Sequence, residues 1–501
     1  MNKRIVIRLV SYILILEAVL MVIPMVVSAI YGEGEVTGAF ILSIVISIVT
    51  GACLYSVRPH DKVIYAKEGF LAVALSWIFL SVFGSLPFLL SGAIPNFFTA
   101  LFETASGFTT TGATALTDVE ALGYGLLFWR SFTHWIGGMG VLVFVLVILP
   151  LGGDRNMHLM RAEVPGPTAG KLVPRMKDTA KILYGIYLSL TILEIVILFI
   201  GKMPLFDCFI NAFGCAGTGG FSNWNNGIAH YNSAYAEIVM GVFMLIFGIN
   251  FNLYYMILIR RMKSFFKNEE LRVYLAVVCF AVLTIALNIK ARYEDFGTAL
   301  RHAFFHVSSI ITTSGFTTDN YENWGSYAQM LLFLLMLLGA CAGSTAGGLK
   351  VSRVMLLFRN AKRGIHRLIH PRSIEIVHID GKMQEETVLQ ESGVYLTIYC
   401  FIMVASMLVI AADGFDIKTN ISTVVTCFNN VGPGFGAVGP TGNFASYSWW
   451  AKLILTFDML AGRLEIFPIL ILFAPSFWHR ARRRGRECER KEPKKRVRII
   501  R

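Results

Sequence analysis

Apolar stretches long enough to cross a membrane recur along the whole chain, and they limit the possible fold more than any other feature. A run of about 18 or more apolar residues is typical of a transmembrane helix. The chain of 501 residues is 55% hydrophobic and only 15% charged, where a soluble protein carries about 25% charged residues. We therefore predict an all-α polytopic membrane protein. The first apolar run, to residue 30, is too long for a signal peptide and lacks a clear cleavage site, so we expect a retained helix.

Basic residues predict which side of the membrane the loops face. The formal net charge is +13, and Lys and Arg cluster at 58–67, 155–181, 260–272, 350–382 and 480–501. The positive-inside rule places these clusters, and with them both termini, in the cytoplasm. We expect the tail at 480–501 to meet anionic lipid or an acidic partner protein rather than nucleic acid.

The eight cysteines are scattered and form no C-x-x-C pair, so we interpret them as packing residues and predict no metal or redox centre from them.

A glycine-containing motif recurs four times after two plain apolar helices at about 5–30 and 37–57. The motifs read TTTGA, GTGGF, TTSGF and NNVGP, at 109–113, 217–221, 312–316 and 429–433. Their aligned glycines, Gly112, Gly220, Gly315 and Gly432, lie 108, 95 and 117 residues apart. The period is therefore near one hundred residues, which predicts four structural repeats.

Each motif follows a segment too short to span the bilayer. These segments, at 96–108, 204–217, 296–312 and 417–430, have 13–17 residues, where a crossing needs about 20. If each short segment enters the membrane halfway and returns, all basic clusters fall on the same side of the membrane. If each short segment crossed fully, the basic clusters would alternate between the two sides. We predict four helix–pore-loop–helix repeats in a pseudo-fourfold, potassium-channel-like arrangement, because irregular backbone at membrane depth must be buried in protein or line a water-filled path.

The loops have the chemistry of a filter for a monovalent cation. Carbonyl and hydroxyl oxygens can replace the water shell of K⁺, and a cage without carboxylates suits K⁺ better than Ca²⁺ or Mg²⁺. Any one of these glycines alone could instead be a helix kink or a helix-packing point. Four glycines at one period make that alternative less favourable. The candidate filter residues are Thr110, Thr111 and Gly112; Thr218, Gly219 and Gly220; Thr313, Ser314 and Gly315; and Asn430, Val431 and Gly432.

At these motifs the chain resembles the Trk/Ktr/HKT superfamily of potassium transporters, specifically its TrkH branch, over nearly its whole length. The resemblance rests on FTTTGAT (108–114), MHLMRAEVPGP (157–167), KLVPRMKDTAK (171–181), CAGSTAGGLKVSR (341–353), NNVGPGFG (429–436) and GRLEIFP (462–468). It implies that the four aligned glycines are the filter glycines. A serine at the first of them goes with sodium permeation in some plant relatives, and this chain has Gly112.

The second and fourth loops depart from a plain T-x-G pattern. Gly219 stands between Thr218 and Gly220, and Asn430 stands where a threonine would be expected. We therefore expect backbone carbonyls to form the site there, and the threonines of the first repeat to contribute most of the side-chain ligation.

A run of ten small residues, GACAGSTAGG at 339–348, interrupts the second helix of the third repeat. One interpretation is a close helix–helix seam. The resemblance implies another, an unwound gating loop beneath the filter. Arg463 is a costly charge at membrane depth that needs a partner; carbonyls of this loop, Glu465 and Asp458 are the candidates. The candidate gate residues are Gly343, Ser344, Thr345, Gly347, Gly348, Lys350 and Arg463.

Several other motifs predict no further activity. GSTAGGLK (343–350) and the glycines at 434, 436 and 439 occur in the wrong context for a nucleotide site, so we expect no nucleotide to bind this chain. Glu17, Glu103 and Glu194 lie in apolar stretches; packing hydrogen bonds, or cation attraction near the mouth for Glu103, are favoured over proton relays. His134 is interpreted as a packing residue.

The expected organisation follows the repeats. Residues 1–67 form an N-terminal helix pair and 68–154 the first repeat. A basic cytoplasmic loop and the second repeat occupy 155–265. The third repeat, at 266–365, contains the gating loop at 339–349. A cytoplasmic segment and the fourth repeat occupy 366–479, and a basic tail follows at 480–501.

The leading hypothesis is K⁺ uptake across the bacterial inner membrane, driven by the membrane potential, with K⁺ as the transported ion. A symporter coupled to H⁺ or Na⁺ with the same fold is the alternative. A membrane enzyme or a purely regulatory subunit explains the four loops less well, so no catalytic residues are assigned. The resemblance further implies a homodimer and a cytoplasmic, nucleotide-binding regulatory subunit similar to TrkA.

Overall fold

The computed structural model describes residues 3–58, 66–140, 176–373 and 375–473. In this part of the chain, six helices are long and apolar enough to cross a membrane, and a pair bent by 90° (α12 and α13) makes up to seven. The basic segments at 155–175 and 480–501 lie outside the described residues. The architecture confirms an all-α polytopic fold.

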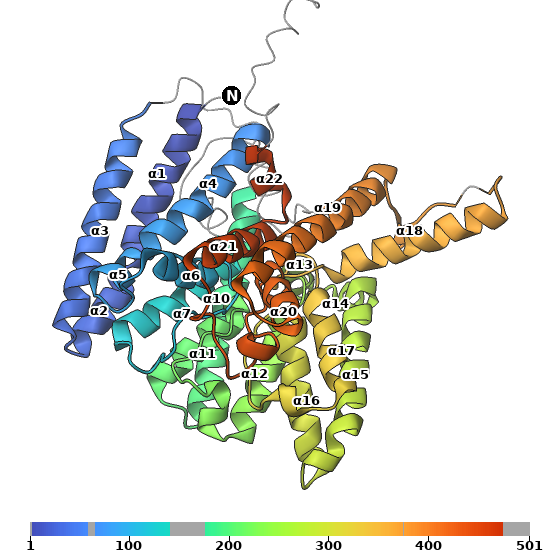
Figure 1. Cartoon of the computed structure of the whole chain (residues 1–501). Coiled ribbons are helices and arrows are strands. Elements are labelled where there is room, and N and C mark those ends of the chain that lie inside the picture. Colours follow the sequence, from blue (N-terminus) through green and yellow to red (C-terminus); the bar gives the residue numbers. More distant parts are fainter. Residues whose placement is uncertain (1–2, 59–65, 141–175, 374, 474–501) are drawn as a thin grey trace, which may run out of the picture.

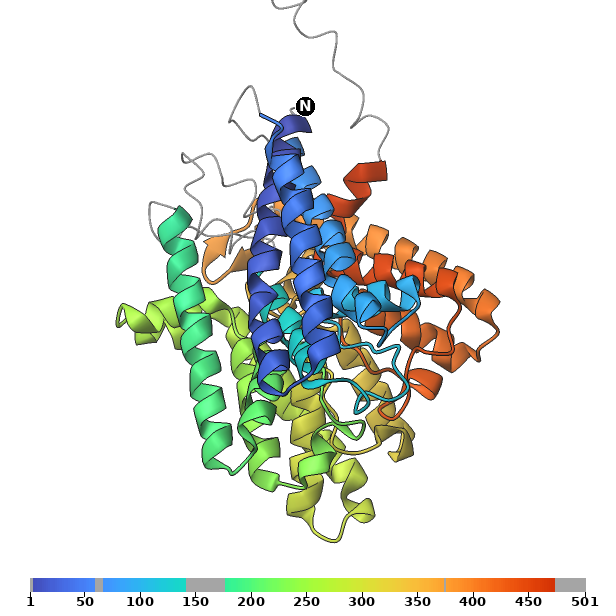
Figure 2. The ribbon, with the colours of Figure 1, turned by 90° about the vertical axis from the view of Figure 1, so that its left-hand side faces the viewer.

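Two antiparallel helices stand at one side of the bundle. α1 (Lys3–Leu20) and α2 (Val22–Ile30) run in one direction, with Pro24 in the first turn of α2, and α3 (Gly34–Tyr55) returns beside them. A proline cannot donate the backbone hydrogen bond of a continuous helix, which explains the break between α1 and α2. Figure 2 shows this pair, in blue, in front of the other helices.

Four units follow, each with a long helix, a short helix and a second helix. The first has α4 (Ala66–Gly84), α6 (Phe97–Phe108) and α7 (Tyr124–Gly138); the second α10 (Met176–Ile200), α11 (Leu205–Gly217) and α12 (Ala234–Phe247); the third α15 (Glu269–Ile289), α16 (Phe296–Ile311) and α17 (Ser326–Leu337); the fourth α19 (Glu386–Ile410), α20 (Ile417–Phe428) and α21 (Trp449–Arg463).

The short helices have 12, 13, 16 and 12 residues. At 1.5 Å per residue they reach at most about 24 Å, less than the hydrocarbon core of about 30 Å. The structure therefore confirms four short helices, each shorter than a full crossing, at the predicted places. Side chains accept hydrogen bonds from the first-turn amides of three of them, which sets where they begin: Asn96 for α6, Asp295 for α16 and Asp416 for α20.

The four units close into a ring. Each short helix packs against the second helix of its own unit and against the second helix of the unit before it; the pairs between units are α7 with α11, α12 with α16, α17 with α20, and α21 with α6. The last pair joins the fourth unit to the first. This cyclic packing is the pseudo-fourfold arrangement that the repeats predicted.

The second helices of the second and fourth units differ from the long apolar helices that we expected, and that of the third unit ends just before the small-residue run at 339–348. α12 is separated by a 90° bend from α13 (Phe251–Leu258). α17 ends at Leu337, and α21 is followed by two left-handed residues, Glu465 and Ile466, before α22 (Phe467–Phe473). Hydropathy did not reveal the breaks after α12 and α21, because the residues around them are mostly apolar; the small-residue run marked the break after α17.

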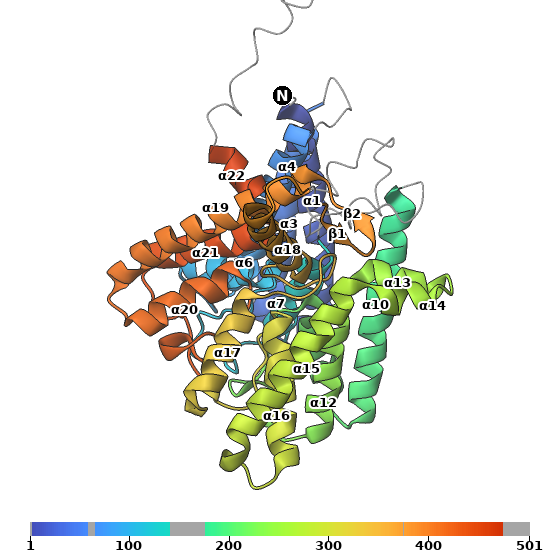
Figure 3. The ribbon, with the colours of Figure 1, turned by 90° about the vertical axis from the view of Figure 1, so that its right-hand side faces the viewer.

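The remaining elements connect the units. They are α5 (Leu86–Leu90), α14 (Met262–Lys267), α18 (Val351–Ile369), the antiparallel pair β1 (His378–Ile379) and β2 (Lys382–Met383), and the short turns η2 (Gly227–Tyr231), η3 (Lys290–Arg292), η4 (Tyr321–Asn323), η5 (Ala411–Asp413) and η6 (Gly436–Val438). α18 extends away from the bundle (Figure 1). Figure 3 views the molecule from the side to which α18 points, with the third unit in front.

Candidate functional site

The four short helices end in the same unusual backbone conformation. Thr110, Thr218, Thr313 and Asn430 are left-handed, with φ between 56° and 59°. At each, the next amide donates to the carbonyl five residues earlier: Thr111 to Ser106 (2.9 Å), Gly219 to Gly214 (2.9 Å), Ser314 to Ser309 (2.8 Å) and Val431 to Thr426 (2.9 Å). A left-handed residue with a side chain costs about 1–2 kcal/mol. Four such residues at equivalent positions give the repeats the same local backbone geometry, and strain of this kind often occurs at functional sites.

The aligned glycines bring the four loops into direct contact. A Cβ on Gly112 would lie 3.0 Å from the carbonyl oxygen of Gly219, so the first loop touches the second. In the same way, an added Cβ would lie 2.2 Å from Ser314 O at Gly220, 2.1 Å from Val431 O at Gly315 and 2.6 Å from Thr111 O at Gly432. The fourth loop thus closes on the first, and all twelve candidate filter residues lie in one ring of backbone.

A cavity of about 150 Å³ lies against this ring. All four aligned glycines line it, together with residues that follow them in sequence, among them Ala113, Thr114, Phe221, Ser222 and residues 438–444. A concave region with convergent polar groups is where a small ligand or ion is expected to bind.

The candidate hydroxyl groups divide into two sets. Thr110 Oγ1 is buried and has no hydrogen-bond partner among the described residues. Thr111 Oγ1 instead bonds Thr109 Oγ1 (2.8 Å) and accepts from Asn430 Nδ2 (2.9 Å), and Ser314 Oγ bonds Thr312 Oγ1 (2.9 Å). The hydroxyls of the second set are engaged with the residues that end α6 and α16 and, for Thr111, with Asn430 of the fourth loop.

The small-residue run is unwound. α17 ends at Leu337 and α18 begins at Val351, and the loop between them closes on itself where Gly339 N donates to Leu349 O (2.8 Å). Gly347 N donates to Thr313 Oγ1 (2.7 Å), and a Cβ on Gly347 would lie 2.4 Å from Asn429 O. The loop therefore contacts the third and fourth filter loops directly.

Carbonyl groups surround the guanidinium of Arg463. Nη1 donates to Thr345 O (2.6 Å), and Nη2 donates to Gly137 O (2.5 Å) and Gly138 O (2.7 Å). The other two candidate partners are engaged elsewhere: Glu465 pairs with Arg353 (2.7 Å) and Asp458 accepts from Ser406 (2.8 Å). Arg463 thus links the 339–349 loop to the end of α7.

The other candidate gate residues fasten the loop to α13 and α12 or form bonds within the loop. Gly343 O accepts from Phe251 N (3.0 Å), Ser344 Oγ donates to Cys341 O (2.6 Å), Thr345 Oγ1 donates to Phe247 O (3.3 Å), and Lys350 Nζ donates to the carbonyls of Ala346 and Gly347. Gly348 is left-handed, with φ of 66°.

Comparison with known proteins assigns the family. A model of the family described as "TrkH: Cation transport protein" matches residues 37–480. The chain belongs to the TrkH family. It is a membrane transport protein and not an enzyme.

Curated relatives of this TrkH-family chain are similar along almost their whole length. It is 37% identical over 485 residues to "Trk system potassium uptake protein TrkH" of Salmonella typhimurium, which covers 95% of this chain and 100% of that protein. It is 33% identical to "Trk system potassium uptake protein TrkG" of Escherichia coli, with 95% and 99% covered.

A solved structure supports the same fold. The crystal structure of the potassium transporter TrkH from Vibrio parahaemolyticus superposes with a TM-score of 0.86 at 33% identity, and the match covers 96% of this chain and 100% of that one.

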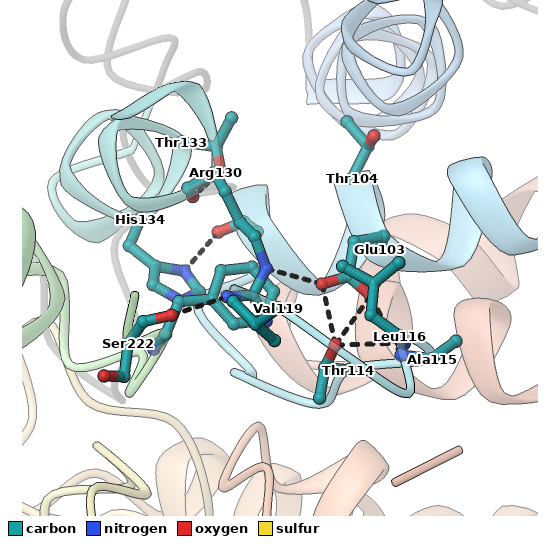
Figure 4. A network of polar contacts seen from close by, with 12 residues as sticks. Glu103, Thr104, Thr114, Ala115, Leu116, Val119, Arg130, Thr133, His134 and Ser222 are labelled. Carbon is teal, nitrogen blue, oxygen red and sulfur yellow. Dashed lines mark hydrogen bonds and ion pairs between the residues drawn. The ribbon is translucent and has the colours of Figure 1, made fainter. Parts of the chain in front are cut away.

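One charged group of this TrkH-family chain was missed by the sequence analysis. Arg130, on α7, lines the cavity and pairs with Glu103 Oε1 of α6 at 2.6 Å (Figure 4). Glu103 was interpreted as a packing or mouth residue, without a named partner. An arginine within the apolar run 124–138 is as costly as Arg463, and that signal could have identified it.

The remaining residues of interest lie away from the cavity wall or serve packing. His134 Nδ1 contacts Gly107 O (2.7 Å), and its Nε2 accepts from Phe221 N (3.3 Å). The ring therefore joins α7 to the end of α6 and to the residue that follows Gly220. Glu17 and Glu194 are buried in α1 and α10 and do not line the cavity.

Proposed function

We propose that this chain carries K⁺ into the bacterial cell through a filter formed by the four loops, driven by the membrane potential. The observation that carries the proposal is the closed ring of contacts in which each aligned glycine approaches a carbonyl of the next loop. Four loops in contact around one axis can supply carbonyl oxygens from four directions, as a dehydrated K⁺ requires, and this supports the proposal.

The identity of the ion follows from the ligand chemistry. The twelve candidate filter residues include no carboxylate, which favours a monovalent cation over Ca²⁺ or Mg²⁺. The relatives named as potassium uptake proteins and the potassium transporter structure support K⁺ as the transported ion.

The 339–349 loop is the gate in this proposal. It contacts Thr313 of the filter on one side and Arg463 on another, through the bonds of 2.7 Å and 2.6 Å described above. A loop of small residues with little apolar surface can move without exposing a large hydrophobic face. Opening would require that Thr345 O release Arg463 and that Gly347 N release Thr313 Oγ1.

Two measurements test the proposal. The chain should restore growth at low external K⁺ in a bacterium that lacks K⁺ uptake, and purified protein in proteoliposomes should take up K⁺ under an imposed inside-negative potential without a pH or Na⁺ gradient. Uptake that requires one of those gradients would instead establish the symporter alternative. A well-folded protein that carries no K⁺ under any gradient would refute both.

We further propose that the protein lies in the inner membrane with both termini in the cytoplasm, works as a homodimer and binds a cytoplasmic, nucleotide-binding regulatory subunit similar to TrkA. The basic segments at 155–181 and 350–382 are the proposed docking segments for such a subunit. Copurification with the regulatory subunit, and the mass of the purified complex, test these assignments.

A further inference from the structure

A buried ion pair joins the first two filter loops at the wall of the cavity. The Arg130 and Glu103 side chains are 3% and 0% exposed, and Nε donates to Oε1 at 2.6 Å. The Arg130 Nη1 group also donates to Ser222 O (2.9 Å), and its guanidinium lies 3.6 Å from the centre of the Phe221 ring. Phe221 and Ser222 directly follow the second filter glycine, so Arg130 holds the second loop.

The carboxylate of Glu103 holds the first loop in the same way. It accepts from Thr114 Oγ1 (3.0 Å) and from Ala115 N (2.9 Å), two and three residues after the first filter glycine. Figure 4 shows the carboxylate between Arg130 and these two residues. The pair therefore forms a continuous bridge from one filter loop to the next.

The position of Glu103 has equivalents in the other three units. Nine residues before each aligned glycine stand Glu103, Asn211, His306 and Thr423. Asn211 bonds Tyr231 Oη (3.2 Å), His306 Nε2 contacts Asp319 O (3.1 Å), and Thr423 Oγ1 bonds Tyr447 Oη (2.7 Å). All four brace the segment that follows the filter, but only the first is a carboxylate facing an arginine.

A cation at this wall affects the ions that the cavity admits. Arg130 lines the same cavity as all four filter glycines, and an unbalanced positive charge there would repel an incoming cation. We propose that Glu103 and Arg130 are a matched charge pair that braces the first two filter loops and keeps this wall electrically neutral, so that the pair sets the apparent affinity for external K⁺. The inference rests on the proposed function and names two positioning residues for it.

The test compares four proteins in proteoliposomes: the unsubstituted chain, Glu103→Gln, Arg130→Gln and the double variant. K⁺ uptake is measured against external K⁺ at ionic strengths of about 0.01 M and 0.1 M, set with choline chloride, where the screening lengths are about 30 Å and 10 Å.

Glu103→Gln should raise the half-saturating K⁺ concentration about tenfold at low ionic strength, and by less at high ionic strength, because its arginine is left unbalanced. Arg130→Gln should shift this concentration in the opposite direction. The double variant should return to within about threefold of the unsubstituted chain.

A matched control is Glu237→Gln. Glu237 is also a buried carboxylate paired with an arginine, Arg301 at 3.0 Å, but it does not line the cavity. Its substitution should leave the half-saturating concentration unchanged.

Two results would overturn the inference: single variants that shift the affinity in the same direction independently of ionic strength, or a double variant no better than Glu103→Gln. If Glu103→Gln does not accumulate as folded protein, Arg130→Gln alone tests the inference. A lower half-saturating K⁺ concentration in that variant supports the inference, and an unchanged or higher one refutes it. Absence of K⁺ uptake by the unsubstituted chain would instead refute the proposed function.

Discussion

At the scale of residues, the ends of the short helices hold side chains where a helix normally ends in glycine. A left-handed residue after a helix is usually glycine, yet this chain uses Thr110, Thr218, Thr313 and Asn430. Thr313 shows what the side chain adds, because its hydroxyl accepts from the 339–349 loop at 2.7 Å. Glycine there would relieve the backbone and lose that contact.

Gly112→Ser should reduce the preference for K⁺ over Na⁺, by about tenfold in the flux ratio if one filter layer loses about 1.4 kcal/mol of discrimination. The residue has φ of 78°, and a Cβ would lie 3.0 Å from Gly219 O, so the new side chain would displace a carbonyl of the neighbouring loop.

Paired K⁺ and Na⁺ flux measurements check this prediction. Gly92→Ser is the matched control, since Gly92 has φ of 73° but no atom within 4 Å of its added Cβ. It should share the backbone strain and leave the flux ratio unchanged. Equal flux ratios for Gly112→Ser and the unsubstituted chain would contradict the filter assignment.

Arg463→Ala should raise K⁺ flux in the absence of any regulatory subunit, by about tenfold or more. The substitution removes bonds to Thr345 O, Gly137 O and Gly138 O, and hydrogen bonds to a charged group contribute about 1.5–3 kcal/mol each. Arg463→Lys, which keeps the charge but not the fork of donors, should be intermediate. Flux at the unsubstituted level in a folded Arg463→Ala protein would exclude a latch.

At the scale of elements, the 339–349 loop depends on one helix that contributes nothing to the filter. Glu270, in the first turn of α15, accepts at Oε1 from Ala342 N (2.7 Å) and from Ser352 N (3.0 Å). Ala342 lies near the start of the loop and Ser352 lies just after its end, in α18, so a single carboxylate ties the first part of the loop to the helix that follows it. Without it the loop would retain its contacts to the filter but lose its anchor.

Glu270→Gln should therefore raise basal K⁺ flux several-fold, because a neutral acceptor makes weaker bonds than a carboxylate. Flux in proteoliposomes checks the prediction. The adjacent Glu269→Gln is the control: Glu269 pairs with Arg359 of α18 at 2.6 Å and makes none of the described bonds to the loop, so its flux should stay within about twofold of the unsubstituted chain. A larger effect from Glu269→Gln would assign the gate to α18 instead.

At the scale of the whole molecule, the ring of units supports the proposal that one chain forms a fourfold filter from unequal parts. The helix packing closes between α21 and α6, and the loops close between Gly432 and Thr111. Because the units differ in sequence, the side chains that support the segment after each aligned glycine also differ, from the charged Glu103 in the first unit to the neutral Thr423 in the fourth. A pore of this type needs no chemical step from the protein.

The whole-molecule proposal predicts how far K⁺ can accumulate. An inside-negative potential of 100 mV contributes about 2.3 kcal/mol per charge, which corresponds to an accumulation of about 50-fold. Proteoliposomes clamped at this potential should reach that ratio and stop there, with equal pH on both sides. A higher limit that grows with an imposed pH or Na⁺ gradient would reveal coupled transport.

The sequence predicted the repeats because their signals are local. Apolar runs, segments of 13–17 residues and the glycine motifs can each be recognised from neighbouring residues. The spacing of the motifs, near one hundred residues, then shows that the units repeat. The small-residue run at 339–348 marked the break after α17, whereas the breaks after α12 and α21 were missed because no comparable run marks them. The partner of Glu103 was missed because it lies 27 residues away on another helix.

The amino-acid sequence by itself thus determined the number of repeats, the half-crossing helices and the residue types available to an ion, because hydrophobic length and backbone preference are properties of short segments. Only the tertiary structure decided which carbonyl each glycine approaches, which hydroxyls serve as braces and which partner each buried charge takes. Those outcomes depend on the closure of four units around one axis, where the fourth unit meets the first from the far end of the chain.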